Sequence, residues 1–295
     1  MFIRRKLALK FQKPFFLFNS IILFFAVLAL LPSCIKPQTA AQTLITLPDA
    51  EPEDYQGDRE AFIDSFWRWT FGDAGLPDEL ALRTVDTLME GPDFVMELLE
   101  ILKDDIFLYA LVDKNNPLPA NYSPVDMVEL NDSAYIVNRS GLLLRLAAAE
   151  ALDRMAIAAR VDGVTLAVSS AYRSYDYQAE VYSRYVLELG AEEADRISAK
   201  PGYSQHQLGL VVDFYPVDDA FAATAAGIWM RENASIYGWS LSYPLDYEEV
   251  TGYSWESWHY RYIGIELARF IEKYFDGIQQ YALQFIKSWM ESTWD

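Results

Sequence analysis

The stretch that decides the fold, residues 201–213, reads Pro-Gly-Tyr-Ser-Gln-His-Gln-Leu-Gly-Leu-Val-Val-Asp. Its first half is rich in turn-forming and polar residues. Its second half opens the apolar, β-branched run 208–215, which predicts a buried strand. A turn carrying His206 therefore leads into a strand carrying Asp213. His206, before the buried strand, and Asp213, within it, are therefore candidates for a catalytic or metal-binding site.

The segments on either side alternate between helical and strand patterns. Residues 164–170 alternate with period 2 and predict a strand. The predicted helices are 140–160, 175–189 and 219–237, and residues 239–262 read as strands joined by an acidic turn. No regular βαβ repetition is present. The sequence therefore predicts an α+β fold in which helices flank a small antiparallel sheet.

The chain ends are predicted to add helices to this fold. Residues 58–72 and 78–104 have helical character, and the Pro/Asn-rich segment 114–126 reads as a surface loop. The last 30 residues are amphipathic, with a break expected at Gly277. We expect an N-terminal helical region over 58–104, a main domain over 105–275 and a C-terminal helix over 276–295.

The N-terminus has the pattern of a targeting segment. Residues 1–13 carry five basic residues and no acid, and residues 15–31 are almost wholly apolar. This pattern is typical of a signal peptide, although 17 residues is also the lower limit for an uncleaved membrane anchor. Cys34, the only cysteine, follows directly and resembles the lipidation site of a bacterial lipoprotein signal over residues 1–33. Pro-rich residues 34–57 read as a tether, and either alternative predicts an extracytoplasmic, membrane-anchored protein.

Composition excludes several classes of protein. The 295 residues carry 24 basic and 43 acidic side chains, a net charge of −19, and loss of residues 1–33 would make this −24. So acidic a chain is not expected to bind nucleic acid. One cysteine excludes an intramolecular disulfide and a thiolate-rich zinc site. Any histidine-based site must use His206, His259 or both.

The two histidines each lie near carboxylates. A catalytic zinc takes three nitrogen or oxygen ligands and leaves a position open for water. His206 and Asp213 can converge on one metal ion, with His259 supplying a third ligand from a neighbouring strand. A turn at 257–258 would let Glu256 reach the same place as a general base. Taken one at a time, these residues are more often structural, and only their combination favours a single zinc site.

Three ordered motifs carry a family resemblance. They are Tyr172-Arg173-Ser174 with Gln178, then Ser204, His206, Gly209 and Asp213, then Glu256-Ser-Trp-His-Tyr-Arg-Tyr262. Together with the loop 116–124 and the helix near 142–159, they resemble the zinc D-Ala-D-Ala carboxypeptidases of the VanY type. The resemblance spans about 107–270 and identifies 105–275 as a zinc carboxypeptidase domain. It implies the fold shared by D,D-peptidases and Hedgehog-like domains.

The resemblance also implies roles for individual residues. His206, Asp213 and His259 match ligands of one zinc ion, and Glu256 matches the catalytic base. Arg173 matches an arginine that stabilises the oxyanion or binds the substrate carboxylate. The matching substrate-binding positions are Gln178, Ser204, Tyr172 and Tyr203. Two positions depart from the family pattern, which usually has arginine at Ser242 and proline at Ser257.

The implied function is removal of a terminal D-alanine from peptidoglycan stem peptides by a monomeric enzyme. Three alternatives stay open at this point. The first is an L,D-carboxypeptidase that acts on trimmed stems, and the second is a peptidoglycan endopeptidase of the same fold. The third is a lipid-anchored, catalytically silent module that binds peptidoglycan. Serine at position 242 removes a positive charge from the family pattern, so the resemblance predicts substrate specificity less firmly than it predicts metal binding.

Overall fold

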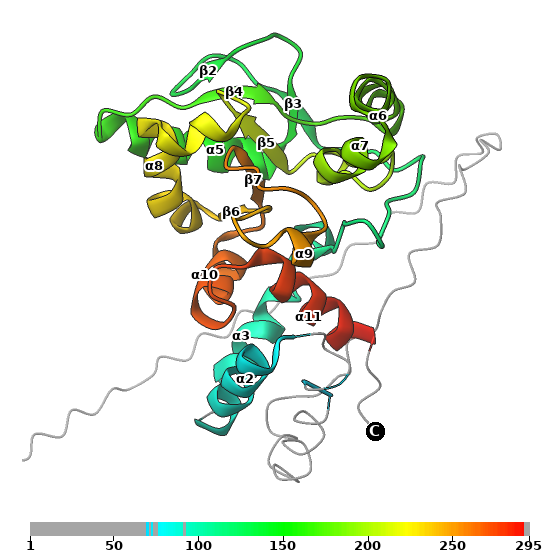
Figure 1. Cartoon of the computed structure of the whole chain (residues 1–295). Coiled ribbons are helices and arrows are strands. Elements are labelled where there is room, and N and C mark those ends of the chain that lie inside the picture. Colours follow the sequence, from blue (N-terminus) through cyan, green and yellow to red (C-terminus); the bar gives the residue numbers. More distant parts are fainter. Residues whose placement is uncertain (1–68, 71, 73–75, 91–92, 292–295) are drawn as a thin grey trace, which may run out of the picture. The chain divides into compact units, whose positions relative to one another are not determined.

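A computed structural model describes residues 69–70, 72, 76–90 and 93–291 of the chain (Figure 1). The predicted signal segment 1–33, Cys34, the tether 34–57 and most of the predicted helix 58–72 lie outside the described residues. Within the described ranges, no helix combines the length and apolar character that crossing a membrane requires.

A five-stranded sheet organises the main domain, with strand order β2-β4-β5-β7-β6. The strands are β2 (Ile136–Val137), β4 (Ala167–Ser170), β5 (Val211–Phe214), β6 (Trp239–Leu241) and β7 (His259–Tyr262). A separate two-stranded sheet pairs β1 (Met127–Glu129) with β3 (Leu143–Arg145). All four residues of β5 are buried, as predicted, but the strand is shorter than the apolar run 208–215, since Leu208 lies in a 3-10 turn and Tyr215 is exposed.

The predicted small antiparallel sheet is confirmed, and its β2 edge adds one parallel pair. β4, β5, β7 and β6 pair antiparallel, whereas β2 and β4 pair parallel. A parallel pair needs a long crossover connection. Helix α5 (Leu146–Val161) lies between β2 and β4 in the chain and supplies it.

The helices agree with their sequence pattern to different degrees. α6 (Tyr175–Leu189) has the predicted bounds, because Ser174 caps its first turn and Gly190 ends it with a positive φ of 84°. The predicted helix 140–160 begins only at Leu146, since Leu143–Arg145 pairs with β1 instead. The predicted helix 219–237 consists of three short pieces, η3 (Asp219–Ala223), α8 (Ala225–Asn233) and η4 (Ala234–Tyr237). The short helices α7 (Ala191–Ile197) and α9 (Glu248–Thr251) were not predicted.

Two apolar clusters stabilise the described chain. The first surrounds the sheet and α5, with Leu152, Met155, Val212 and Trp239 buried in it. The second joins α2 (Asp78–Glu90), α3 (Asp93–Ile101), α10 (Ile265–Tyr274) and α11 (Gln279–Glu291). The predicted break at Gly277 is confirmed and separates α10 from α11.

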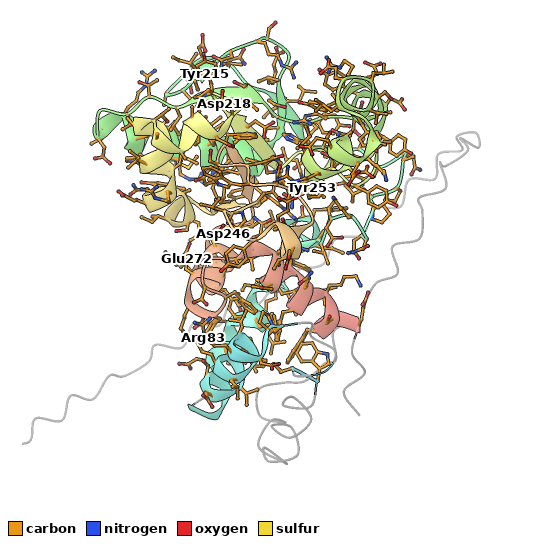
Figure 2. The ribbon with its side chains drawn as sticks, viewed as in Figure 1. Arg83, Tyr215, Asp218, Asp246, Tyr253 and Glu272 are labelled. Carbon is orange, nitrogen blue, oxygen red and sulfur yellow. The ribbon has the colours of Figure 1, made fainter. Side chains whose placement is uncertain are left out.

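The second cluster places the two chain ends of the described region against one another. Phe94 of α3 contacts the rings of Phe270 and Phe285 from α10 and α11. Arg83, labelled in Figure 2, pairs with Asp276 at 2.7 Å, just before Gly277. The N-terminal and C-terminal helices therefore pack together as one body beside the sheet.

Candidate metal centre

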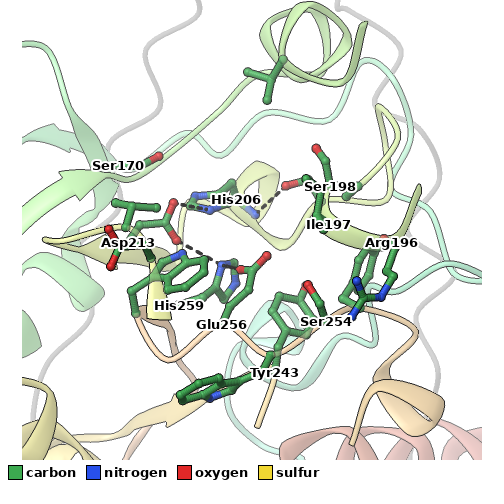
Figure 3. A pocket seen from close by; sticks show the side chains of 18 of the residues that line it. Ser170, Arg196, Ile197, Ser198, His206, Asp213, Tyr243, Ser254, Glu256 and His259 are labelled. Carbon is green, nitrogen blue, oxygen red and sulfur yellow. Dashed lines mark hydrogen bonds and ion pairs between the residues drawn. The ribbon is translucent and has the colours of Figure 1, made fainter. Parts of the chain in front are cut away.

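Asp213 and His259 are brought together by strand pairing. They are direct partners in the antiparallel register of β5 and β7. His259 Nδ1 lies 3.1 Å from Asp213 Oδ1, and both side chains are buried (Figure 3). Because opposed residues in such a ladder have neighbouring side chains, the register itself sets this distance.

His206 arrives from the turn that precedes β5. It lies in η2 (Gln205–Leu208), a single 3-10 turn that Ser204 caps by accepting a hydrogen bond from the His206 N–H. Gly209 ends the turn with φ +68°, and a Cβ there would lie 2.9 Å from Met127 Sδ. The left-handed backbone favours glycine, and a larger residue would also displace the Met127 side chain. His206 Nε2 thereby reaches to 3.1 Å from Asp213 Oδ2.

These three residues offer ligand atoms to one point. One atom from each of His206, Asp213 and His259 lies within 4.8 Å of the others. His206 donates from Nδ1 to the carbonyl of Ala171 at 2.6 Å, which leaves the lone pair of Nε2 facing the centre. Within the described ranges, Asp213 Oδ1 is buried and accepts no hydrogen bond. A buried set of two nitrogens and one carboxylate fits the donor set of a catalytic zinc.

The electrostatics of the set also suit a cation. Burial and the charge of Arg173 lower the pKa of His206 to about 4, so this ring is neutral at pH 7. Burial alone would raise the pKa of Asp213, but His206, His259 and Arg173 hold it well below its usual range. Burial alone would lower the pKa of His259, but the carboxylates of Asp213 and Glu256 raise it to about 9. The site thus concentrates negative charge around His259 Nδ1.

Glu256 reaches the centre because of the turn expected at 257–258. The turn lies directly before β7, and His259 N–H donates to the Glu256 carbonyl at 3.2 Å. Glu256 Oε2 lies 3.2 Å from His259 Nδ1, and its side chain keeps 15% of its surface exposed in the groove. A carboxylate that touches both the ligand set and open space is placed to exchange protons with a bound molecule.

Arg173 points into the same centre from the loop after β4. Its Nη2 donates to His206 Nε2 at 2.7 Å and to Asp213 Oδ2 at 2.8 Å. Its Nη1 donates to Gln178 Oε1 at 3.1 Å, and Nε donates to Ser170 Oγ at 3.2 Å. The guanidinium therefore lies against two of the three ligands, and its hydrogen bonds to Gln178 and Ser170 fix its orientation.

The substrate-binding positions implied by the resemblance divide into two groups. Gln178 and Ser204 line the groove at the metal centre, although both are buried. Gln178 also donates to the carbonyl of Ala199 at 2.7 Å, so it connects Arg173 to the segment after α7. Tyr172 and Tyr203 lie outside that groove. Tyr172 shares a hydrogen bond with Ser123, and Tyr203 lines a smaller neighbouring pocket.

The groove above the centre is much larger than the ligand set. It has a volume of about 1210 Å³ and is walled by α6, α7, α9 and the loop after β5. Its walls include residues that the sequence did not single out: Arg139, Tyr177, Tyr185, Arg196, Asp218, Leu245, Glu248 and Trp255. Arg196 pairs with Glu248 and joins α7 to α9 at one part of the wall. These residues belong to no shared sequence motif, so only the packing of helices and strands shows that they line one groove.

Comparisons with known proteins agree with this geometry. The family model described as VanY, D-alanyl-D-alanine carboxypeptidase, matches residues 141–265. A Bacillus subtilis (strain 168) protein, YodJ, which is named as a carboxypeptidase, is 36% identical over 199 residues. The match covers 62% of this chain and 72% of YodJ. The chain belongs to the VanY family.

Other VanY-family relatives extend the comparison. The D-alanyl-D-alanine carboxypeptidase of Enterococcus faecalis is 38% identical over 169 residues. That match covers 54% of this chain and 59% of the enterococcal protein. The chain thus spans well under two thirds of that relative's length.

Solved structures show the same fold. The LdcB LD-carboxypeptidase has a TM-score of 0.52 and 36% identity, covering 58% of this chain and 86% of that one. A glutamate-to-alanine variant of VanY from a VanB-type resistance cassette was solved in complex with Zn(II). It has a TM-score of 0.50 and 34% identity, covering 59% of this chain and 98% of that one. The expected α+β fold is therefore confirmed.

Proposed function

We propose that this chain is a zinc-dependent carboxypeptidase that removes the terminal D-alanine from peptidoglycan stem peptides. The observation that carries the proposal is the buried set of His206, Asp213 and His259, flanked by Glu256 and Arg173 at the floor of one groove. Membership of the VanY family and the relatives named for D-Ala-D-Ala hydrolysis support the substrate.

The residues divide the chemistry among them. His206, Asp213 and His259 would hold one zinc ion, which polarises the scissile carbonyl and lowers the pKa of water when bound. Glu256 accepts a proton from the attacking water and returns it to the leaving amine, since its carboxylate is open to the groove. Arg173 brings a fixed positive charge to the developing oxyanion or to the terminal carboxylate.

An L,D-carboxypeptidase is the second candidate, because LdcB matches this chain with 36% identity. The two activities differ in the stem that they trim. We expect the full chain, purified in detergent with zinc, to release D-alanine from a pentapeptide stem ending in D-Ala-D-Ala. Release from a tetrapeptide stem alone would favour the L,D activity, and cleavage inside a cross-link would favour an endopeptidase.

Absence of any release would remove the enzymatic proposal. If the protein is a catalytically silent binding module, the wild type and Glu256→Ala should bind peptidoglycan equally well, and neither should release product. A true hydrolase would bind in both forms but lose product release in the variant. Sedimentation of the protein with purified cell walls, followed by product analysis of the same sample, separates these outcomes.

We also propose that the protein works outside the cytoplasm as a membrane-anchored monomer. The basic and apolar segment 1–33 followed by Cys34 supports lipid anchoring. Mass spectrometry of the mature N-terminus should find a lipidated Cys34, and Cys34→Ser should release the protein from membranes. An intact N-terminus in the membrane fraction would indicate an uncleaved anchor instead. Size-exclusion chromatography with light scattering checks the monomer.

A further inference from the structure

Gln205 lies directly behind the metal ligand His259, on the side away from the groove. Its side-chain oxygen Oε1 is 3.4 Å from His259 Nε2 and accepts a hydrogen bond from Ser242 Oγ at 2.7 Å. Gln205, Ser242 and His259 are each at most 3% exposed. Neither Gln205 nor Ser242 lines the groove, so they act on bound molecules only through His259.

The chemistry of this contact selects one form of the ring. A neutral imidazole carries one proton, and an amide oxygen can only accept. Metal binding requires the neutral ring, and in that ring an Oε1 facing Nε2 favours the tautomer protonated at Nε2, which leaves the Nδ1 lone pair for the metal ion. That Nδ1 is the atom 3.1 Å from Asp213 Oδ1 and 3.2 Å from Glu256 Oε2. The favoured tautomer is thus the one that can ligate a metal ion.

Ser242 and helix α11 keep the amide of Gln205 in place. Ser242 donates its hydroxyl proton to Oε1, and its backbone N–H donates to the His259 carbonyl at 3.3 Å. Gln279, the first residue of α11, is 1% exposed and lies 3.4 Å from Ser242 Oγ. The adjacent Gln280 donates to Asp113 Oδ2 at 2.8 Å and fastens the helix there. A dry environment strengthens such buried hydrogen bonds.

We propose that Gln205 and Ser242 are positioning residues that hold His259 as the tautomer able to bind the metal. The proposal rests on the zinc centre of the proposed function. Partners of this kind behind a ligating histidine raise metal affinity by fixing the tautomer and orientation of the ring. At Ser242, where the family pattern has arginine, the hydroxyl supplies the fixing hydrogen bond.

Zinc affinity, measured by competition with a chromogenic chelator, tests the proposal without any substrate. Gln205→Met keeps the shape but removes the acceptor, and we expect zinc binding to weaken about 10-fold to 100-fold. Ser242→Ala removes one hydrogen bond and should weaken binding about fivefold. Gln205→Glu keeps an acceptor oxygen at this position, and its zinc affinity should stay within about threefold of wild type.

Gln207→Met is the matched control. Gln207 is a fully buried glutamine on the same turn, but its side-chain amide donates to the carbonyls of Pro119 and Tyr122 at 3.0 and 3.1 Å rather than to a side chain of the metal centre. We expect a lower unfolding temperature and unchanged zinc affinity. If Gln207→Met weakens zinc binding as much as Gln205→Met, loosening of the turn explains both and the proposal is overturned.

The ring itself gives a second readout. In the zinc-loaded wild type, the His259 Nε2 proton should appear in the NMR spectrum and exchange slowly with water. It should persist in Gln205→Glu and be lost in Gln205→Met. Persistence in Gln205→Met, or zinc affinity within twofold of wild type in folded Gln205→Met and Ser242→Ala, overturns the proposal. If Gln205→Met does not fold, Ser242→Ala decides it. Failure of the wild type to bind zinc would instead remove the proposed function.

Discussion

Asp213 and His259 stand directly opposite one another on β5 and β7, with His259 Nδ1 3.1 Å from Asp213 Oδ1. Two of the three ligand positions are therefore set by backbone hydrogen bonds of the central sheet rather than by loops. A slip of one residue in this register would turn one side chain to the opposite face. The sheet consequently fixes these two positions relative to one another, whereas His206 is placed by the turn before β5.

Metal removal should lower both activity and stability. Dialysis against a chelator is expected to abolish D-alanine release, and added zinc should restore it. Zinc binds only the folded arrangement of His206, Asp213 and His259, so saturation at 100 times the dissociation constant should add about 2.7 kcal/mol to the free energy of unfolding. Thermal unfolding with and without zinc checks this value. Full activity of protein shown to be metal-free would contradict the proposed centre.

Glu256→Gln should separate metal binding from catalysis. The amide keeps the shape of the side chain but cannot accept a proton, so kcat should fall about 10²-fold to 10⁴-fold. Zinc content, measured by atomic emission on the same sample, should match that of wild type because Glu256 is not one of the three ligands. A variant with undiminished turnover would exclude Glu256 as the base.

Arg173→Ala should reduce kcat/KM by about 10²-fold to 10³-fold, because the guanidinium is the positively charged group hydrogen-bonded to Asp213 and His206. Comparing substrates with a free and an amidated C-terminus identifies its role. If the loss persists on the amidated peptide, Arg173 acts on the oxyanion. If the loss disappears there, Arg173 binds the carboxylate. Equal rates for variant and wild type on both substrates would exclude either role.

Arg261→Met should destabilise the fold without touching the groove. Arg261 is fully buried, and its Nη2 donates to the carbonyls of Phe107, Leu108 and Ala110. Burial lowers its pKa to about 10, so removing the charge returns part of its desolvation cost. Three carbonyls that lose their donor outweigh this, and we expect a net loss of about 1–3 kcal/mol. Urea unfolding measures it.

The matched control for that variant is Arg160→Met. Arg160 is exposed near the end of α5, and its replacement should change the free energy of unfolding by less than about 0.5 kcal/mol. An equal loss in both variants would show that charge removal, rather than the three carbonyl contacts, causes the effect.

Local signals predicted some elements well and failed where pairing partners matter. Helix 175–189 was predicted to the residue because Ser174 and Gly190 are start and stop signals within the chain itself. Residues 143–145 were expected to be helical but form a strand, since β1 offers them a pairing edge. The parallel pairing of β2 with β4 likewise depends on where α5 packs. Pairing energy from distant residues overrides a local period.

The candidate site shows the same division. The two histidines stand out as candidates because the chain has no others, and Asp213 and Glu256 because they lie in the same motifs as the histidines. Tyr172 and Tyr203 sit beside the motifs in sequence but outside the groove in space. The sequence pattern assigns no role to Gln205, although this residue adjoins His206. Its signal is a buried polar side chain, and burial is not visible in a sequence.

The sequence by itself determined which groups are candidates for the chemistry, since two histidines and an ordered set of motifs left few alternatives. Only the tertiary structure decided how they meet. His206 and His259 are 53 positions apart, and their ring centroids lie 4.9 Å from each other because β5, which follows the turn carrying His206, pairs with β7. Arg173 and the Gln205–Ser242 pair reach the same centre through side-chain packing. Residue type is local information, whereas distance between remote side chains follows from strand pairing and burial of the whole chain.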